Sequence, residues 1–341
     1  MGSKMDEIIK NVNKRAKEEI MSIGLGEFNY DRIPFTSPRM NYCTFGGIPV
    51  SKVTELFGPE HSGKTTTALD LIANFQHSDD PRKVLYVDAE NTLDLVWAEK
   101  LGVNVDDMYM VQPKSQSAEE LLDVILNSVD TGEIGLWVLD SVGALISARD
   151  LENSLEDTSY GGIARPMTTF SKKIEMLMHR HKCTGIGINQ VRDDLKNPYG
   201  GENTPGGKAW RHVCCARMRF SMGKFLDEKG NELPRTAESP AGIYILMSMI
   251  KNKTCPPTRR TGFYTANFET GIDYIRDLVD VAIKYDVVKK SGGWYDIIDL
   301  SSGELINDGK IQGMSNLRQY LEENVEILQQ IEMQVNAKMG I

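Results

Sequence analysis

Cysteine is scarce in this chain of 341 residues, and its five copies are odd in number. They stand at Cys43, Cys183, Cys214, Cys215 and Cys255, without the paired spacing that is typical of a metal site. A disulfide between the two adjacent cysteines would be strained. We therefore expect all five thiols to be reduced, as in a cytoplasmic protein, and to act as small apolar side chains.

Long apolar runs are also missing. No segment approaches the roughly 20 apolar residues that a membrane-spanning helix needs, and no signal-peptide pattern opens the sequence. An excess of basic residues is missing as well, because the formal net charge is −9. This balance argues against nucleic acid as a partner, but a basic channel can lie within an acidic protein, so local charge has to decide. We expect a cytoplasmic protein with no membrane contact.

Apolar residues make up 40% of the chain and charged residues 26%, which is ordinary globular usage. From Lys52 onward, short apolar runs alternate with helical stretches. The runs VTELF, VLYVDAE, MYMVQ, LWVLD and TGIGINQ predict strands, and residues 64–76, 117–129 and 163–181 predict helices. This alternation predicts an α/β fold with βαβ units, a mainly parallel twisted sheet and functional sites at the carboxyl ends of its strands.

The flanking regions have different patterns. Residues 5–22 predict an amphipathic helix, which could pack on its own domain or on another subunit. After Trp210, the runs VCCARMRFSM and GIYILMSMIKNK predict strands joined by a polar hairpin at 224–240. Beyond them, a helix at 272–285, a strand at 294–298 and a terminal helix predict a small α+β domain. We expect an N-terminal helix in 1–30, a core in 31–270 and a C-terminal domain in 271–341.

The stretch GPEHSGKT follows a predicted strand and opens a predicted helix. It fits the P-loop pattern, in which backbone N–H groups and a helix N-terminus bind phosphate. Lys64 is expected to reach the β- and γ-phosphates of ATP, and the Thr65 hydroxyl to bind Mg²⁺. The expected nucleotide-binding residues of this stretch are Gly58, Pro59, Glu60, His61, Ser62, Gly63, Lys64, Thr65 and Thr66.

Carboxylates end two neighbouring strands. Asp140 ends LWVLD, where an acid can hold Mg²⁺ through water. Glu90 ends VLYVDAE, where it can polarise the water that attacks the γ-phosphate. Asp94 follows, and Trp97 could either lie against a purine or be buried by an amphipathic helix.

Together these motifs resemble the bacterial RecA recombinase family. The resemblance rests on GPEHSGKTT, VDAENTLDLVWAEKLGV, LWVLDSVGAL, GINQVR, the Gly206-Gly207 pair, IKNKTCPP and the stretch GIDYIRDLVDVAIKYDVVKKSGGWYDI, and more loosely on ELPRTAESPAG. It runs in unbroken order from about residue 44 to about residue 330. It implies a RecA-type P-loop ATPase that forms a helical filament on single-stranded DNA and exchanges strands with homologous duplex DNA.

The resemblance also implies roles for single residues. It places Asp94 and Trp97 at the adenine and gives Glu90 and Asp140 the roles expected above. Lys251 and Lys253 match lysines that reach the ATP of the neighbouring subunit, where their charges would stabilise the γ-phosphate. His212 stands where the family has an interface phenylalanine, which suggests a divergent branch such as a phage-encoded one. Single-strand-binding and loader proteins are further expected partners.

Two loops, at about 148–167 and 191–207, are expected to converge on DNA. The first is acidic in its middle, and the second is rich in Gly, Pro, Asn and charge. Glycine backbone amides can approach phosphate closely, and aromatic or apolar side chains can lie between bases. The expected DNA-binding residues are Arg165, Lys172, Arg192, Tyr199, Gly206, Gly207, Lys208 and Arg211.

Gln190 ends a buried strand and begins the second loop. We expect its side chain to sense the γ-phosphate and to set the order of the loop that follows, which would make ATP binding and loop order reciprocal. Two other functions share the P-loop: a hexameric RecA-fold DNA helicase, and an ATP-binding assembly protein that does not hydrolyse ATP. The helicase would not be expected to carry both the KNK motif and the C-terminal segment, and Glu90 argues against the second.

Overall fold

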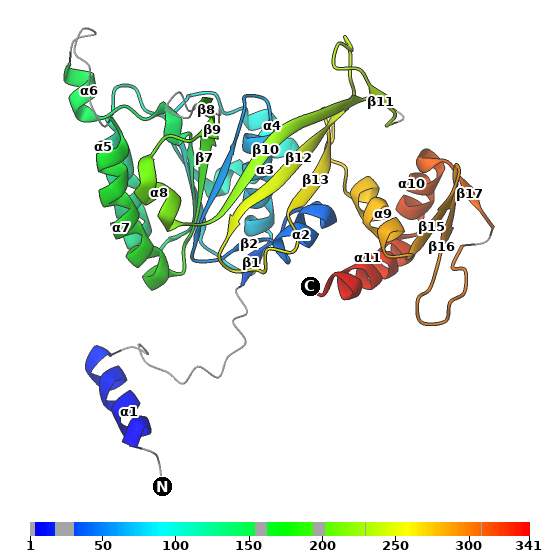
Figure 1. Ribbon diagram of the computed structural model, residues 1–341, viewed down its shortest axis with the longest axis horizontal. Helices are drawn as coiled ribbons and strands as arrows, with labels where there is room; N and C mark the ends of the chain where they lie inside the picture. Colours follow the sequence, from blue (N-terminus) through cyan, green and yellow to red (C-terminus); the bar gives the residue numbers. More distant parts are fainter. Residues whose placement is uncertain (1–3, 18–30, 154–161, 194–201, 229, 308) are drawn as a thin grey trace. The chain divides into compact units, whose positions relative to one another are not determined.

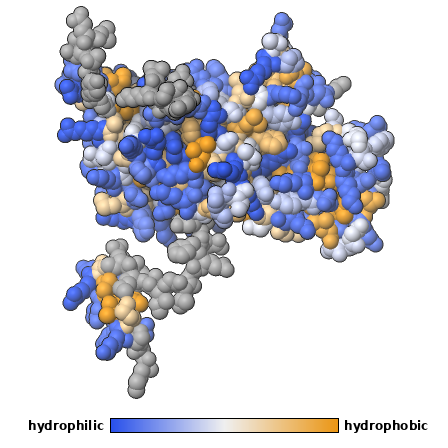
Figure 2. Space-filling view, in the orientation of Figure 1, coloured by the Kyte–Doolittle hydropathy of each residue, from blue (hydrophilic) through white to orange (hydrophobic). Residues whose placement is uncertain are grey.

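A computed structural model describes residues 4–17, 31–153, 162–193, 202–228, 230–307 and 309–341. The chain divides into two compact units, residues 1–31 and residues 32–341. In the first unit, helix α1 (Lys4–Ala16) begins one residue before the predicted helix, and residues 18–30 lie outside the described part. No residue of α1 is buried, and Met5 and Ile8 are about half exposed, at 51% and 46%. Figure 2 shows apolar side chains gathered on this helix.

The second unit is built on one large sheet, which has ten strands among the described residues. Parallel pairing joins β5 (Met108–Val111), β4 (Lys83–Asp88), β6 (Ile134–Asp140), β7 (Thr184–Gln190), β3 (Val53–Gly58) and β10 (Cys214–Leu226), in that order. Beyond β10 the pairing is antiparallel, through β12 (Gly242–Asn252), β13 (Thr261–Asn267) and β14 (Gly271–Ile272). A short β11 (Glu232–Leu233) pairs with β10. The prediction of a mainly parallel α/β sheet is confirmed (Figure 1).

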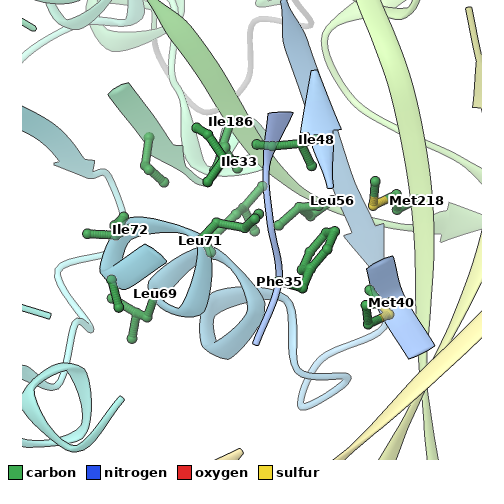
Figure 3. Close-up of a cluster of buried hydrophobic side chains, with 14 of the residues drawn as sticks. Ile33, Phe35, Met40, Ile48, Leu56, Leu69, Leu71, Ile72, Ile186 and Met218 are labelled. Atoms are coloured by element: carbon green, nitrogen blue, oxygen red, sulfur yellow. The ribbon is translucent and has the colours of Figure 1, made fainter. Parts of the chain in front are cut away.

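Both faces of the sheet are covered, which explains why its central strands β3 and β6 are buried along their whole length and largely apolar. Along β6, Leu136 and Val138 join one buried cluster, while Trp137 and Leu139 join another. This alternation follows from the two-residue period of a strand. The first cluster lies under α3 (Lys64–Gln76), as Figure 3 shows for several of its members. The second lies under α5 (Ala118–Asp130) and α7 (Ala164–His181), which pack against each other.

Several short elements lack a periodic pattern long enough for prediction. They are β1 (Arg32–Ile33), α2 (Pro38–Thr44), β2 (Ile48–Pro49), α4 (Leu95–Lys100), η1 (Val105–Asp107), η2 (Val142–Ala144), α6 (Ala148–Glu152), β8 (Arg192–Asp193), β9 (Glu202–Asn203) and α8 (Gly207–Val213). Three of them, α6, β8 and β9, correct the view of 148–167 and 191–207 as plain loops. Helix α6 occupies the start of the first, and the β8–β9 ladder closes the base of the second.

The C-terminal region has its own buried cluster. It consists of α9 (Tyr274–Lys284), β15 (Val288–Ser291), β16 (Trp294–Ile297), β17 (Ile311–Gln312), α10 (Met314–Glu323) and α11 (Val325–Met339). The prediction of one terminal helix is wrong, because Asn324 leaves helical geometry (φ −123°, ψ 70°) and its amide donates to Tyr320 O at 2.8 Å. The three domain boundaries predicted from the sequence remain predictions. No described helix has both the length and the apolar character needed to cross a membrane.

Candidate active site

The P-loop joins β3 to α3 at the carboxyl edge of the sheet. At Gly58, a Cβ atom would lie 2.2 Å from Phe220 O, so only glycine fits there. Gly63 has a φ of 84° and begins α3, whose N-terminus faces the loop. The buried Lys64 donates from Nζ to Pro59 O at 2.6 Å. Burial lowers the pKa of Lys64, and the charges of Asp140, Glu90 and Glu60 oppose that shift. The arrangement is a cradle for an anionic phosphate chain.

Asp140 ends β6 beside the first turn of α3. Its Oδ2 accepts hydrogen bonds from Thr65 Oγ1 at 2.9 Å and from Tyr86 OH at 2.8 Å. Burial raises the pKa of Asp140, while the hydrogen bonds from Tyr86 and Thr65 hold it down. A carboxylate oxygen and a hydroxyl in contact are the hard ligands that Mg²⁺ accepts, with water completing its shell. These residues therefore fit the Mg²⁺ site expected from the sequence. The described residues hold no cluster of three or more His, Cys, Asp or Glu side chains suited to a metal.

Glu90 lies where three strand ends meet. Its Oε1 accepts a hydrogen bond from Ser141 Oγ, the residue after Asp140, and another from Gln190 Nε2 at 3.2 Å. Gln190 ends β7 and also donates its backbone N–H to Asn189 Oδ1 at 3.1 Å. The structure thus brings together the two residues assigned to water activation and to γ-phosphate sensing. A carboxylate held by two neutral donors keeps lone pairs free to orient a water molecule.

A cavity of about 540 Å³ opens beside the P-loop. Residues 61–66 line one side and Trp97 lies on α4, where its Nε1 donates to Thr66 Oγ1 at 3.3 Å. Sequence analysis did not predict the remaining wall, which consists of Met222, Phe225, Ile243, Ile245, Ala266 and Phe268. Phe268 is 44% exposed at this wall. An apolar cavity with an indole and a phenyl ring suits a flat base.

Asp94 has a local role that the sequence did not predict. It is the N-cap of α4, and its Oδ1 accepts the backbone N–H of Trp97 at 3.1 Å. It does not line the cavity among the described residues. Its geometry therefore fixes the helix that carries Trp97.

Lys251 lies near the end of β12, Lys253 directly follows it, and both lie against α8. Lys251 Nζ donates to Arg211 O at 2.6 Å, and Lys253 Nζ donates to His212 O at 2.9 Å. Within one subunit, these charges therefore cap the carbonyl end of α8, a favourable place for cations. Burial lowers the pKa of Lys251, and the neighbouring charge of Lys253 lowers it further.

The residues expected to contact DNA fall into two groups. Lys208 and Arg192 are exposed near α8 and β8, and Arg211 Nη1 donates to Asn203 Oδ1 at 3.3 Å on β9. Arg165 and Lys172 are exposed on α7. Arg165 instead lines a cavity of about 390 Å³ with α5 residues such as Glu119 and Asp123, and no described residue of 202–211 lines that cavity. Tyr199 lies outside the described residues, as do residues 154–161.

The ends of the two segments meet at a pair of glycines. A Cβ atom on Gly207 would lie 3.1 Å from the Cβ of Ala164, so α7 and α8 start side by side. A Cβ atom on Gly206 would lie 3.1 Å from the ring of Trp210. Both glycines also have positive φ, at 97° and 79°. Backbone geometry and packing thus already require these glycines, whatever their contact with phosphate.

Two family models together match almost the whole chain. Residues 3–273 match the family model of the RecA N-terminal domain, and residues 276–340 match that of the RecA C-terminal domain. The chain belongs to the RecA family. Protein RecA of Sulfurovum sp. (strain NBC37-1) is 34% identical over 341 residues, covering 98% of this chain and 92% of the relative. Protein RecA of Staphylococcus carnosus (strain TM300) is 32% identical over 343 residues, with 99% and 90% covered.

A third relative, Protein RecA of Campylobacter jejuni subsp. doylei, is 33% identical over 335 residues and covers 98% of the chain. The match therefore includes the P-loop core as well as the C-terminal region. The resemblance to RecA inferred from the motifs is confirmed, and so is the recombinase function that this family has in homologous recombination and repair.

Proposed function

We propose that this RecA-family chain is a DNA-dependent ATPase that polymerises on single-stranded DNA and exchanges strands with a homologous duplex. The hydrogen bond between Gln190 Nε2 and Glu90 Oε1, at 3.2 Å, carries this proposal. It joins Glu90, the residue suited to activate water, with Gln190, the residue directly before the segment expected to contact DNA. A site that only bound ATP would have no use for such a link.

Different residues of the chain would bind the phosphates, the metal ion and the base, and activate the water. Lys64 and the P-loop amides hold the triphosphate, and Thr65 with Asp140 holds Mg²⁺, which neutralises charge on the β- and γ-phosphates when bound. Glu90 accepts a proton from the attacking water. Trp97 and Phe268 enclose the adenine. Lys251 and Lys253 leave the carbonyls of α8 and act on the ATP of the neighbouring subunit.

Binding to DNA is proposed through cations near the shared start of α7 and α8. Lys208, Arg211 and Arg192 would contact phosphates, which requires no particular sequence. The overall negative charge makes this contact depend on local geometry and on salt. The proposal includes a cytoplasmic location and, as further partners, single-strand-binding and loader proteins.

The decisive experiment is ATP-dependent strand exchange between a circular single strand and a homologous linear duplex, with ATP hydrolysis recorded with and without single-stranded DNA. We expect joint molecules only with ATP, Mg²⁺ and homology, and faster hydrolysis with DNA. Unwinding of a forked duplex without pairing would identify a helicase instead. Assembly without hydrolysis would identify a non-hydrolysing ATP-binding protein, and either result would overturn the proposal.

A further inference from the structure

A row of residues crosses the sheet at one register, from the strand that precedes the proposed DNA-binding segment to Lys251 of β12. Its members are paired strand by strand: Gly187 on β7, Glu55 on β3, Arg217 on β10 and Lys251 on β12. Residues paired across neighbouring strands lie on the same face of a sheet. Glu55 stands three residues before Gly58, where the P-loop begins.

Glu55 is a fully buried carboxylate with three donors. Its Oε1 accepts from Asn189 Nδ2 at 2.9 Å and from Trp210 Nε1 at 2.9 Å, and its Oε2 accepts from Arg217 Nε. A buried charge is tolerated only when it is paired and hydrogen-bonded, and losing one partner is costly. The geometry of these donors is therefore held firmly around the carboxylate.

The same donors reach both ends of the segment that begins after Gln190. Asn189 Nδ2 also donates to Pro205 O at 3.0 Å, and Arg217 Nη2 donates to Thr204 Oγ1 at 3.0 Å. The entry strand β7 and the exit at 204–205 are thus tied to one carboxylate. These hydrogen bonds hold the two ends of the segment together and do not depend on the conformation of the residues between them.

Helix α8 is held from both sides of the same row. On one side, Trp210 donates to Glu55, and a Cβ atom on Gly187 would lie 2.3 Å from Cζ2 of the Trp210 ring, so glycine provides the space for the indole. On the other side, Lys251 Nζ contacts Arg211 O at 2.6 Å. A change in position of α8 must therefore alter both the segment exit and the contact with Lys251.

We propose that Glu55 is a positioning residue that anchors α8 through Trp210 and Arg217 and so couples the DNA-facing segment to ATP hydrolysis. Glu55 does not touch the nucleotide site residues directly, and it acts through the helix. This inference rests on the proposed function, since it assumes that DNA stimulates hydrolysis. Strand β3 would then have two functions, since it leads into the P-loop and also carries the residue that anchors α8.

The chain contains a matched control for this proposal. Trp137 is also fully buried, and a Cβ atom on Gly185 of β7 would lie 2.2 Å from its Cζ2. Gly185 thus provides space for the Trp137 indole as Gly187 provides space for the Trp210 indole. The Nε1 of Trp137 has no hydrogen-bond partner among the described residues. Trp137→Phe and Trp210→Phe therefore remove the same atoms from similar sites, but only Trp210→Phe removes a hydrogen bond to the carboxylate.

The test compares these two variants with wild type by ATP hydrolysis with and without single-stranded DNA. We expect Trp210→Phe to lower the DNA stimulation about ten-fold, with DNA-independent hydrolysis and the KM for ATP unchanged. Trp137→Phe should keep full stimulation. Glu55→Gln should also lower the stimulation of hydrolysis by DNA, because its amide places an N–H₂ group among hydrogen-bond donors. The double variant Glu55→Gln with Trp210→Phe should lose little more stimulation than Glu55→Gln alone, since both changes break the same hydrogen bond.

Amide hydrogen exchange of residues 207–213 supplies a readout that does not depend on activity. Faster exchange in Trp210→Phe than in Trp137→Phe is expected, and equal exchange would overturn the anchor. If wild type is stimulated by DNA and Trp210→Phe is stimulated equally, the coupling inference fails while the proposed function stands. If wild type itself shows no stimulation, the proposed function fails and the coupling fails with it.

Discussion

Glu90 links, among the described residues, the proposed nucleotide site to the strand that leads into the proposed DNA-binding segment. One of its oxygens accepts from Ser141, which follows the proposed Mg²⁺ ligand Asp140, and from Gln190, which directly precedes the segment proposed to contact DNA. Both donors are neutral, so each can exchange its bond for one to a water or a phosphate at small cost. This makes the triad suited to change with the state of the nucleotide.

Replacing Glu90 by Gln should abolish turnover without preventing assembly. An amide keeps the shape but cannot accept a proton from water, so we expect ATP hydrolysis to fall by at least about 100-fold. ATP binding and ATP-dependent filaments should persist in electron micrographs. Glu99→Gln, an exposed carboxylate on α4, is the control and should leave hydrolysis unchanged. A Glu90→Gln protein with wild-type turnover would remove Glu90 from the mechanism.

Gln190→Ala should separate hydrolysis from DNA. The change removes the 3.2 Å hydrogen bond to Glu90 but leaves the P-loop and its lysine in place. We expect ATP affinity to stay within about two-fold, because a neutral hydrogen bond contributes little net free energy, and the stimulation of hydrolysis by DNA to be lost. Nucleotide titrations and ATPase assays with and without DNA measure the two quantities. Full stimulation in the variant would contradict the proposed switch.

At this scale the sequence predicts residues whose chemistry is local. Lys64, Thr65 and Asp140 lie where the P-loop pattern and the strand end require, because each follows directly from an element on its own stretch of chain. Phe268 and Ile245 could not be predicted as cavity walls, since their positions depend on the order in which β12 and β13 join the sheet. The bond between Trp210 and Glu55 links residues 155 positions apart and escapes prediction for the same reason.

At the scale of elements, α9 connects the C-terminal region to the central sheet through a buried acid. Asp277 is fully buried, and its Oδ1 accepts from the Thr265 hydroxyl on β13 at 3.0 Å. Burial raises the pKa of Asp277 to about 7, while hydrogen bonds and the charge of Arg39 act against the rise. Between its ordinary value of 3.8 and about 7, the folded chain holds a proton that the unfolded chain has released. Stability therefore falls as pH rises through this window.

Asp277→Asn should remove that dependence. A neutral amide still accepts from Thr265, so between about pH 4 and pH 7 the free energy of unfolding should improve relative to wild type by up to about 1.4 kcal/mol per pH unit. Urea unfolding at pH 5 and pH 8 measures the difference. Asp286→Asn, an exposed position with positive φ that suits Asn, is the control and should show no such trend. A parallel shift at both pH values would contradict the assignment.

Element prediction succeeded where a pattern is long and uninterrupted. Strand β7 and helix α3 have the bounds that their sequences predict, 184–190 and 64–76. It failed at Asn324, where one polar residue divides an otherwise helical stretch and its side-chain amide donates to the backbone carbonyl of Tyr320. It also missed the β8–β9 ladder, because two paired residues carry no periodic signal.

At the scale of the whole molecule, the apolar side of α1 is the surface from which a subunit contact can be proposed. Met5 and Ile8 are about half exposed, and no residue of this helix is buried within the chain. The sequence leaves two partners for this helix, its own domain or another subunit. A helix that packs on a neighbour in head-to-tail fashion gives an open filament when the rotation does not close.

Deleting residues 1–28 should therefore prevent filaments while preserving the fold of the core. Electron microscopy with DNA and ATP should show short or absent filaments, whereas circular dichroism should show an intact α/β protein. Ile8→Asp should give the same result more selectively, because it places a charge on the apolar side, at a cost in association of at least about 1 kcal/mol. Glu7→Gln, an exposed polar position on α1, is the matched control and should assemble normally. Normal filaments from both the deletion and Ile8→Asp would exclude α1 from the subunit contact and return it to its own chain.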